Sequence, residues 1–267
     1  MKKLDLSDCH SVLLDIAKSF HRLCRDNDIP YYMLGGTMLG AIRHKGFIPW
    51  DDDMDFGIPR EHFSRFIRLA QKEFPPYYQV LFLENSDYAL TGFAKISDSR
   101  TLIKEQFSVR TSENIGVNVD VFPLDDSDAN WSFGSFNMCV RSMFKFQKLL
   151  IVNSKDRPFF KRILSRLVQL LVPISKRSIP VFLERMIVRR PVKDREMWSN
   201  FFGAWGAKET VPKRVFGKPT LYQFEDTMFF GAENYDRYLS TLYGDYMTPP
   251  DPSCIHVHQS SAYSVSQ

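Results

Sequence analysis

Hydrophobic and polar positions follow two different periods along this 267-residue chain, and the dominant period changes near the middle. In the first half, short apolar runs with strand-like alternation separate stretches with the 3.6-residue spacing of amphipathic helices. The expected helices span 8–27, with Asp8 as the N-cap, 37–43 and 59–74. The expected strands span 31–34, 54–58, 78–84, 93–98, 101–104 and 117–122. This pattern predicts an α+β fold.

Helical spacing dominates the second half of the chain. The expected helices span 132–151, 158–172, 179–190, 194–202 and 233–243, and the last of them precedes a proline-rich tail. We therefore expect three parts, namely a mixed α+β core over 1–130, a basic helical insert over 131–205, and a C-terminal segment over 206–267 that packs back on the core.

Charge divides the chain in a similar way. Residues 141–195 hold 15 of the 35 Lys and Arg but only 3 of the 31 Asp and Glu, a net charge of +12, which leaves −8 for the remainder. Within residues 155–190, basic side chains are interleaved with large apolar ones. One interpretation is a cationic amphipathic surface that rests on an anionic membrane. The other is a helix with its apolar side on the core and its basic side in water. No recognition motif accompanies the charge, so nucleic acid is not an expected partner.

The cysteines and the apolar runs indicate the compartment. The four cysteines are scattered without paired spacing, which argues against a disulfide framework and favours a reducing cytoplasm. His256 and His258, near Cys254, lack a second ligand pair and are interpreted as incidental rather than as zinc ligands. The sequence shows no apolar leader and no apolar stretch long enough to span a bilayer. We expect a cytoplasmic protein that is neither secreted nor integral to a membrane.

The strongest chemical signal is the acidic run Asp-Asp-Asp-Met-Asp, which ends at Asp55. Such a cluster repels itself unless cations neutralise it, and Mg²⁺ or Mn²⁺ is the usual oxygen-bound cation. If residues 54–58 form a strand, Asp53 and Asp55 point to one face and can bridge a divalent cation. Asp51 is a further candidate ligand. Asp120 lies within an apolar strand, where an unpartnered charge is costly, so we expect it to complete the metal site or to accept a proton.

Phosphate-binding residues are expected upstream of the acidic run. Gly35 and Gly36 lie between an expected strand and an expected helix. There, a backbone without Cβ atoms can approach phosphate oxygens, and a helix N-terminus offers N–H groups. Arg43, His44 and Lys45 follow within reach of the same pocket. A phosphate held there would meet amides, cations and a metal together.

Three stretches of the chain carry recognisable motifs. The first stretch comprises GGT at 35–37 and LGAIRHKGFIPWDDDMD at 39–55. The second stretch is VDVFP at 119–123. The third stretch comprises YD at 235–236, YGDYM at 243–247 and PP at 249–250. Together they resemble the LicD family, which includes bacterial phosphocholine transferases and is similar to the fukutin-related ribitol-phosphate transferases. Residues 229–231 depart from the pattern, because a proline is expected ahead of the Tyr-Asp helix. Residues 130–215 show no specific match.

The resemblance implies a nucleotidyltransferase-like mixed β-sheet flanked by helices, and a metal-dependent phosphotransferase. Such an enzyme moves a phosphorylated small alcohol, phosphocholine foremost, from a CDP-linked donor to a hydroxyl of a cell-surface or lipid-linked glycan and releases CMP. The resemblance implies that Asp53, Asp55 and Asp120 are metal ligands. It also implies that Gly35, Gly36 and Thr37 bind the donor phosphates. Asp120 is the expected general base, and His44 is the alternative. The basic helices would make the protein peripheral at the inner membrane face.

Two other functions fit parts of the pattern. A glycosyltransferase could use Asp53-Met54-Asp55 to hold the metal of a nucleotide-sugar, with no strict need for Asp120. A non-catalytic scaffold that binds cations or membranes could use the acidic loop structurally, but a calcium loop needs oxygen ligands at regular spacing rather than one dense cluster. Choline phosphate, alditol phosphates and sugar phosphates all suit the same metal site.

Overall fold

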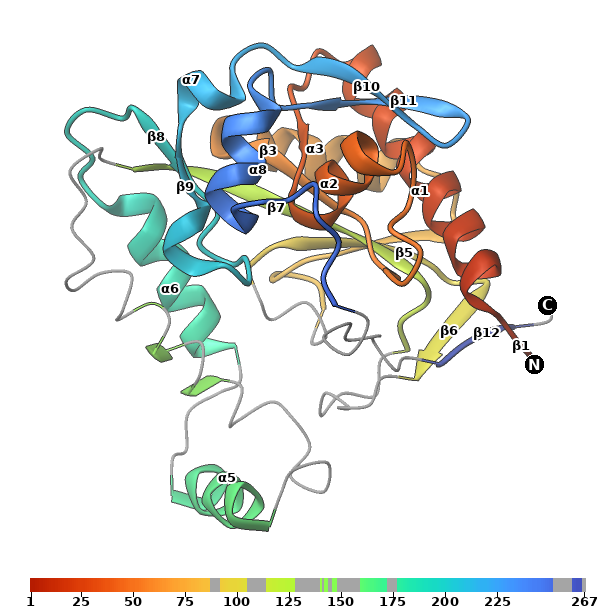
Figure 1. The fold of residues 1–267 in the computed structure, drawn as a ribbon. Helices are drawn as coiled ribbons and strands as arrows, with labels where there is room; N and C mark the ends of the chain where they lie inside the picture. The colour runs from red at the N-terminus through yellow and green to blue at the C-terminus, as the bar shows by residue number, and fades with distance from the viewer. Residues whose placement is uncertain are drawn as a thin grey trace.

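The computed structural model describes residues 1–86, 92–104, 114–127, 140, 142–143, 146–147, 159–171, 177–251 and 261–265 (Figure 1). Its helices are α1 (Leu6–Asp26), α2 (Gly35–Arg43), α3 (Arg60–Glu73), α5 (Phe159–Leu171), α6 (Ser178–Arg189), α7 (Lys213–Phe216) and α8 (Tyr235–Tyr243), with a 3₁₀ turn η2 (Gly206–Glu209). Its strands are β1 (Lys2–Lys3), β2 (Tyr32–Met33), β3 (Asp55–Pro59), β4 (Tyr78–Leu81), β5 (Ala94–Asp98), β6 (Thr101–Lys104), β7 (Asn118–Ser127), β8 (Met197–Ser199), β9 (Thr210–Pro212), β10 (Thr220–Phe224), β11 (Thr227–Gly231) and β12 (Ser261–Ser264).

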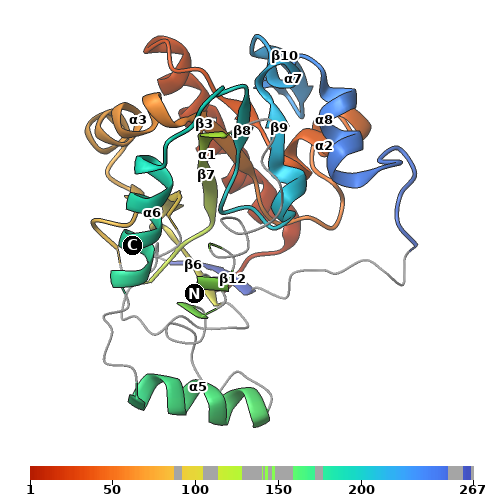
Figure 2. The ribbon, with the colours of Figure 1, turned by 90° about the vertical axis from the view of Figure 1, so that its left-hand side faces the viewer.

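A seven-stranded mixed sheet forms the centre of the fold. Its strand order is β2-β3-β7-β5-β4, and β8 and β9 extend it from the end of β7. β3 and β7 run parallel, whereas β5 pairs with β7 in the antiparallel sense. α1 and α3 cover one face of this sheet, and α2 and α8 pack together on the other side (Figure 1, Figure 2). The expected mixed sheet flanked by helices is therefore confirmed.

An aromatic cluster between α1 and the sheet sets the direction of the side chains on β3. Phe20 of α1 contacts the rings of Tyr31, Phe56 and Phe66 at centroid distances of 4.8, 4.7 and 5.3 Å. All four side chains are fully buried. Successive residues of a strand point to opposite faces. Because Phe56 points toward α1, Asp55 points to the opposite face of the sheet.

Two helices begin earlier than the pattern predicts. Asp5, not Asp8, is the N-cap of α1, because its carboxylate accepts the Asp8 N–H at 2.8 Å while the Asp8 carboxylate accepts the Asp5 N–H at 3.3 Å. This reciprocal pair is a capping box, and it places Asp8 at the third helical position. α2 begins at Gly35 rather than at Thr37, and Gly35 has a φ of 47°.

The second half contains more strand than its helical spacing predicts. α5, α6 and α8 confirm three expected helices, but the expected helix at 194–202 is wrong. β8 forms there instead and pairs with β7, so that Trp198 lies opposite Asp126. The edge of the long strand β7 offers backbone hydrogen bonds, and such nonlocal pairing outweighs local spacing. The hairpin of β10 and β11 was not expected either.

Some of the elements and residues expected from the sequence lie outside the described residues. The expected helix at 132–151 lies outside the described residues except at 140, 142–143 and 146–147, and Cys254, His256 and His258 lie outside them as well. The division into three parts stays a prediction. Within the described part of the chain, no helix combines the length and the apolar character needed to cross a lipid bilayer.

Candidate active site

Three charged residues form a row across neighbouring strands of the sheet. Asp55 of β3 lies opposite Asp120 of β7, and Lys95 of β5 lies opposite Asp120 on its other side. Directly opposed residues project their side chains to the same face of a sheet. The Lys95 Nζ donates to Asp120 Oδ1 at 2.6 Å and to Asn118 Oδ1 at 3.1 Å. The charge within β7 therefore has a protein partner, which the sequence analysis did not identify.

Asp55 and Asp120 of this row line a cavity of about 220 Å³ between the sheet, the start of α2, α8 and the segment 200–209. Asp53, Asp55 and Asp120 all line it, as do Gly35 and Gly36. The remaining lining residues are Leu34, Phe93, Phe122, Asn200, Phe202, Gly203, Ala204, Trp205, Glu209, Tyr238 and Leu242. The structure thus brings five of the sequence-predicted site residues to one cavity, although they come from three separate parts of the chain.

The carboxylates of this cavity perturb one another. Burial raises the pKa of Asp55 well above its ordinary value, and the nearby Asp53 and Asp120 raise it further. Burial also raises the pKa of Asp120, while Lys95 opposes that rise. Asp51 is not among the described lining residues but lies against Gly36, and burial together with Asp53 and Asp52 raises its pKa to about 7. Crowded, desolvated carboxylates either take up protons or attract a cation, so this cavity favours cationic ligands.

The start of α2 packs closely against these carboxylates. A Cβ atom on Gly36 would lie 2.6 Å from Asp51 Oδ2, and a Cβ atom on Gly35 would lie 3.7 Å from Asp55 Oδ2. The Gly35 N–H donates to the Tyr238 hydroxyl at 3.1 Å. A side chain at position 36 would therefore displace the Asp51 carboxylate, and α8 anchors the first residue of α2.

Thr37 ties α2 to β3. Its hydroxyl accepts the Asp55 N–H at 2.8 Å, and its side chain is buried. In this structure the hydroxyl thus positions the acidic strand. Direct contact of Thr37 with donor phosphates stays a prediction.

The three basic residues at the end of α2 do not line the cavity. Arg43 donates to His44 Nε2 at 2.9 Å and to the Tyr246 carbonyl at 2.8 Å. The Lys45 carbonyl accepts the Glu225 N–H at 2.7 Å. None of the three is among the described residues that line the cavity. The reason is that α2 continues from Gly35 to Arg43 without a break, which separates its ends by about 12 Å at 1.5 Å per residue. Their predicted role in phosphate binding has no support from this placement.

The donor set suits a hard divalent cation in its chemistry. Asp53, Asp55 and Asp120 supply carboxylate oxygens, which Mg²⁺ and Mn²⁺ prefer. Within the described ranges, however, no group of three or more Asp, Glu, His and Cys side chains is close enough to hold a metal as it stands. Lys95 occupies one oxygen of Asp120. Binding of a divalent cation by Asp53, Asp55 and Asp120 stays a prediction.

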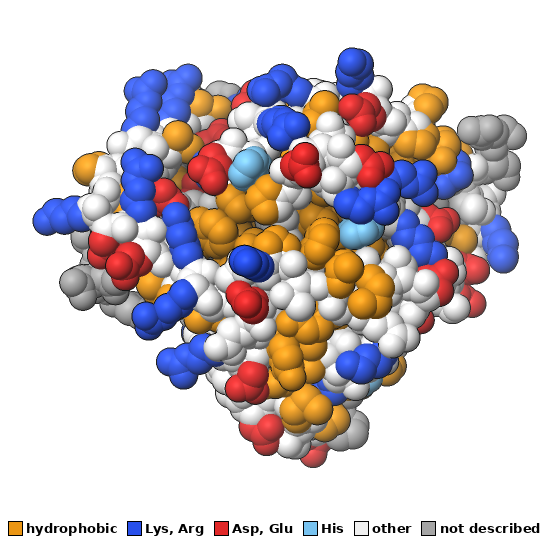
Figure 3. Space-filling view, turned by 90° about the horizontal axis from the view of Figure 1, so that it is seen from above, with side chains coloured by type: hydrophobic (Ala, Val, Ile, Leu, Met, Phe, Trp, Pro, Cys, Tyr) orange, Lys and Arg blue, Asp and Glu red, His pale blue; other side chains and the backbone are white. Residues whose placement is uncertain are grey.

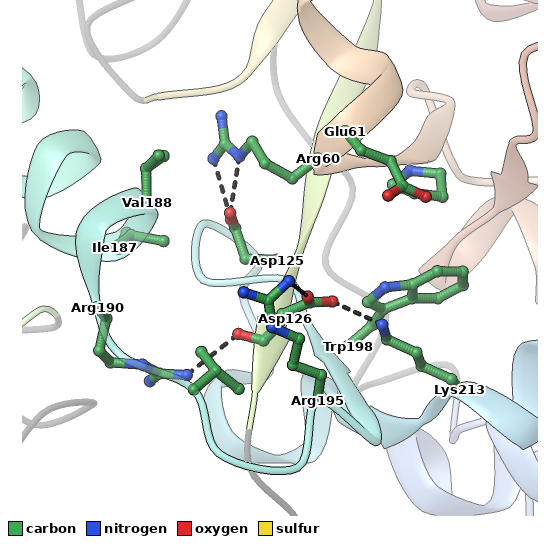
Figure 4. Close-up of a pocket in the computed structure, with 12 residues that line it drawn as sticks. Arg60, Glu61, Asp125, Asp126, Ile187, Val188, Arg190, Arg195, Trp198 and Lys213 are labelled. Atoms are coloured by element: carbon green, nitrogen blue, oxygen red, sulfur yellow. Dashed lines mark hydrogen bonds and ion pairs between the residues drawn. The ribbon is translucent and has the colours of Figure 1, made fainter.

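A second cavity, of about 230 Å³, lies at the other end of β7 (Figure 4). Arg60 donates to both carboxylate oxygens of Asp125, at 2.7 and 2.9 Å. Asp126 forms ion pairs with Lys213 at 2.7 Å and with Arg195 at 3.6 Å. Protein cations neutralise both carboxylates, which is typical of an ion-pair network that joins structural elements. The first cavity is the better candidate active site.

Sequence reasoning missed part of this site. Lys95 carried a local signal, because it is a lone charge between the apolar residues Ala94 and Ile96 of a strand. The segment 200–209 carried none, because it enters the cavity only through the pairing of β8 with β7.

Comparison with known proteins shows to which family the chain belongs. Residues 28–165 match the family model described as LicD/FKTN/FKRP, nucleotidyltransferase domain. The chain is 30% identical, over 98% of its length and 99% of the relative's, to the lipopolysaccharide cholinephosphotransferase LicD of Haemophilus influenzae. It is 27% identical to the mouse ribitol 5-phosphate transferase FKRP over 43% of this chain and 21% of that protein. The chain therefore belongs to the LicD/FKTN/FKRP nucleotidyltransferase-domain family.

Proposed function

We propose that this protein is a metal-dependent phosphotransferase that moves phosphocholine from a CDP-linked donor to a hydroxyl of a cell-surface glycan, such as lipopolysaccharide, teichoic acid or capsule, and releases CMP. The observation that carries this proposal is the meeting of Asp53, Asp55 and Asp120 at one cavity beside the start of α2. The nearly full-length similarity to a lipopolysaccharide cholinephosphotransferase supports the choice of transferred group and acceptor.

In this mechanism the acidic residues have two roles, metal binding and proton acceptance. Asp53 and Asp55 would hold Mg²⁺ or Mn²⁺, and the metal would supply positive charge against the donor phosphates, which the acidic cavity would otherwise repel. The acceptor hydroxyl attacks the phosphorus that carries choline. The bond from that phosphorus to the CMP oxygen breaks, and CMP leaves. Asp120, once parted from Lys95, takes the hydroxyl proton as general base. The backbone at the start of α2 receives donor phosphate oxygens.

Substitution of the acidic pair tests this function. Purified wild type, Asp53→Asn and Asp55→Asn are compared for CMP release from CDP-choline with Mg²⁺ and a glycan acceptor. We expect each variant to lose at least about 100-fold in rate, since several kcal/mol of charge stabilisation disappear. Asp226→Asn is the matched control, because Asp226 is exposed and pairs with Lys18 at 2.8 Å away from the cavity. Full CMP release by both site variants would rule the proposal out.

The CMP-release assay, together with calorimetry, separates this function from the glycosyltransferase and the non-catalytic scaffold. A glycosyltransferase would turn over UDP- or GDP-sugars and would tolerate Asp120→Asn. A non-catalytic scaffold would bind Ca²⁺ tightly in calorimetry and would show neither nucleotide binding nor CMP release. The three outcomes do not overlap.

A second part of the proposal concerns where the enzyme works. α5 exposes five large apolar side chains, with exposed fractions from 43% at Ile163 to 83% at Phe160, and it also carries Lys161, Arg162 and Arg166. Two views show α5 set apart from the sheet (Figure 1, Figure 2). Apolar and cationic groups on one helix fit the anionic surface of a bilayer. We propose a cytoplasmic protein that docks through α5 on the inner membrane face, where lipid-linked glycans are met.

The opposite end of the molecule has a different character. On the face seen from above in Figure 3, Lys and Arg side chains are interspersed with Asp and Glu around exposed apolar side chains. The described side chains of this face therefore form no continuous basic stripe of the kind that nucleic acid binds.

Co-sedimentation with vesicles tests the docking. We expect binding to vesicles with anionic phosphatidylglycerol, little binding to neutral phosphatidylcholine vesicles, and a loss on addition of salt. Leu164→Ser should weaken binding, whereas Leu221→Ser, at a comparably exposed leucine on β10, should not. Equal binding of the two variants would contradict docking through α5.

A further inference from the structure

Part of the cavity lining is aromatic. Phe93 and Phe122 contact each other at a tilt, with their centroids 4.4 Å apart and their planes 34° apart. Phe202 and Trp205, from the segment 200–209, also line the cavity. The Trp205 indole packs edge-on against Tyr243 at 4.9 Å, and 45% of the Trp205 surface stays exposed. Aromatic side chains and carboxylates thus line the same cavity.

Phe202 and Trp205 are held in place by neighbouring residues. Gly92 has a φ of 82°, and the Phe202 ring occupies the space that a side chain at position 92 would need. The Glu209 carboxylate accepts the backbone N–H of Trp205 at 2.8 Å and lies directly over Gly203. The Phe202 ring is therefore held by a contact that glycine permits at position 92, and Glu209 holds the backbone at Trp205.

The charge of the cavity selects among ligands. Its four lining carboxylates are Asp53, Asp55, Asp120 and Glu209. Of these, Asp120 is paired with Lys95 at 2.6 Å. The Lys208 ammonium lies 5.7 Å from the centroid of the Trp205 ring, which shows that this ring can receive a cation. A quaternary ammonium group is a cation without N–H donors, and aromatic faces attract it through their ring quadrupoles. A polyhydroxylated alditol would instead need hydrogen-bonding side chains around its hydroxyls.

The size of the cavity is compatible with a small head group. At about 220 Å³ it is smaller than the roughly 300–1,000 Å³ pockets that enclose drug-sized ligands. It can enclose one end of a nucleotide-linked donor while the remainder lies at its mouth.

We propose that Phe202 and Trp205, with Glu209 beside them, form the subsite for the trimethylammonium group of choline and so determine which phospho-alcohol is transferred. This inference rests on the proposed function. The same rings could instead stack on the cytosine of the donor, and the experiment separates these two sources of an aromatic contact.

The test compares CDP-choline with CDP-ethanolamine, which has the same nucleotide but lacks the three methyl groups. CMP release is followed for wild type, Trp205→Leu, Phe202→Leu and the conservative variant Trp205→Phe, and CMP is also titrated as an inhibitor. We expect wild type to prefer CDP-choline, and Trp205→Leu and Phe202→Leu each to reduce that preference about tenfold in kcat/KM. Trp205→Phe should retain most of the preference, and the inhibition constant of CMP should not change.

Three outcomes would overturn the inference. One is an unchanged preference in Trp205→Leu. Another is a parallel loss for both donors with weaker CMP inhibition, which would assign the ring to cytosine. The last is wild-type turnover of CDP-glycerol or CDP-ribitol without turnover of CDP-choline, which would leave a phosphotransferase with a different substrate. No CMP release from any CDP-linked donor would instead refute the proposed function. Phe182→Leu, at an exposed ring on α6, is the control for general effects of removing a ring.

Discussion

Replacement of Lys95 by Met probes the electrostatic balance of the site. Lys95 Nζ lies 2.6 Å from Asp120 Oδ1, and the two side chains are only 15% and 19% exposed. Loss of one partner of a buried ion pair lowers stability by about 3–5 kcal/mol, because the other charge is left desolvated. Since part of each side chain still meets water, we expect Lys95→Met to lower the free energy of unfolding by about 3 kcal/mol, the lower end of that range, at pH 8 without divalent metal.

The measurement is urea unfolding followed by circular dichroism, with EDTA present. Lys18→Met is the matched control, because it removes the same ammonium from a pair of similar length, 2.8 Å, whose Asp226 side chain is 69% exposed. Exposed pairs contribute little to stability. The destabilisation of Lys95→Met should shrink as the pH falls, since burial raises the pKa of Asp120 and its protonated form needs no cation.

Metal dependence completes this test. If Lys95 and a divalent cation compete for Asp120, Mg²⁺ should bind Lys95→Met more tightly than it binds wild type. A tenfold tighter binding would add about 1.4 kcal/mol of stabilisation at saturating metal. The reasoning fails if Lys95→Met is no less stable than Lys18→Met, or if Mg²⁺ stabilises Lys95→Met and wild type equally.

Three more predictions concern other parts of the fold. Arg60→Met should lower the free energy of unfolding by about 3–5 kcal/mol, because it leaves the Asp125 carboxylate, only 5% exposed, without its Arg60 partner. Adding Asp125→Asn to the Arg60→Met variant should restore part of this free energy in urea unfolding. Gly92→Ala should raise KM for CDP-choline, because a Cβ at this positive φ meets the Phe202 ring; an unchanged KM would show that the ring position is irrelevant. Metal-free protein should lose thermal stability as the pH rises toward about 7. The pKa of Asp51 is raised to about 7 in the folded state, so the folded state binds the Asp51 proton more tightly than the unfolded state does. Calorimetry should show that Mg²⁺ reverses this trend.

Local pattern was sufficient for much of the site. The 3.6-residue spacing identified α1 and α3, and the two-residue alternation identified β3 and β7. The same alternation correctly separates Asp55 from Phe56, which points into the core. Asp120 stood out because a charge interrupts an apolar strand. Each inference depends on residues only a few positions apart, and such local constraints survive folding.

Contacts between distant parts of the chain determined the rest. β8 formed in place of an expected helix because β7 offered it a partner, and that pairing carries Trp205 into the cavity. The unbroken α2 separated Arg43 from the glycines at its start, although they are close in sequence. Lys95 became the partner of Asp120 through the register of two antiparallel strands. The sequence by itself determined which residues carry the acidic chemistry, because that signal is local. Only the tertiary structure decided that Lys95 pairs with Asp120 and which aromatic side chains line the same cavity, because strand register and helix packing depend on residues far apart in the chain.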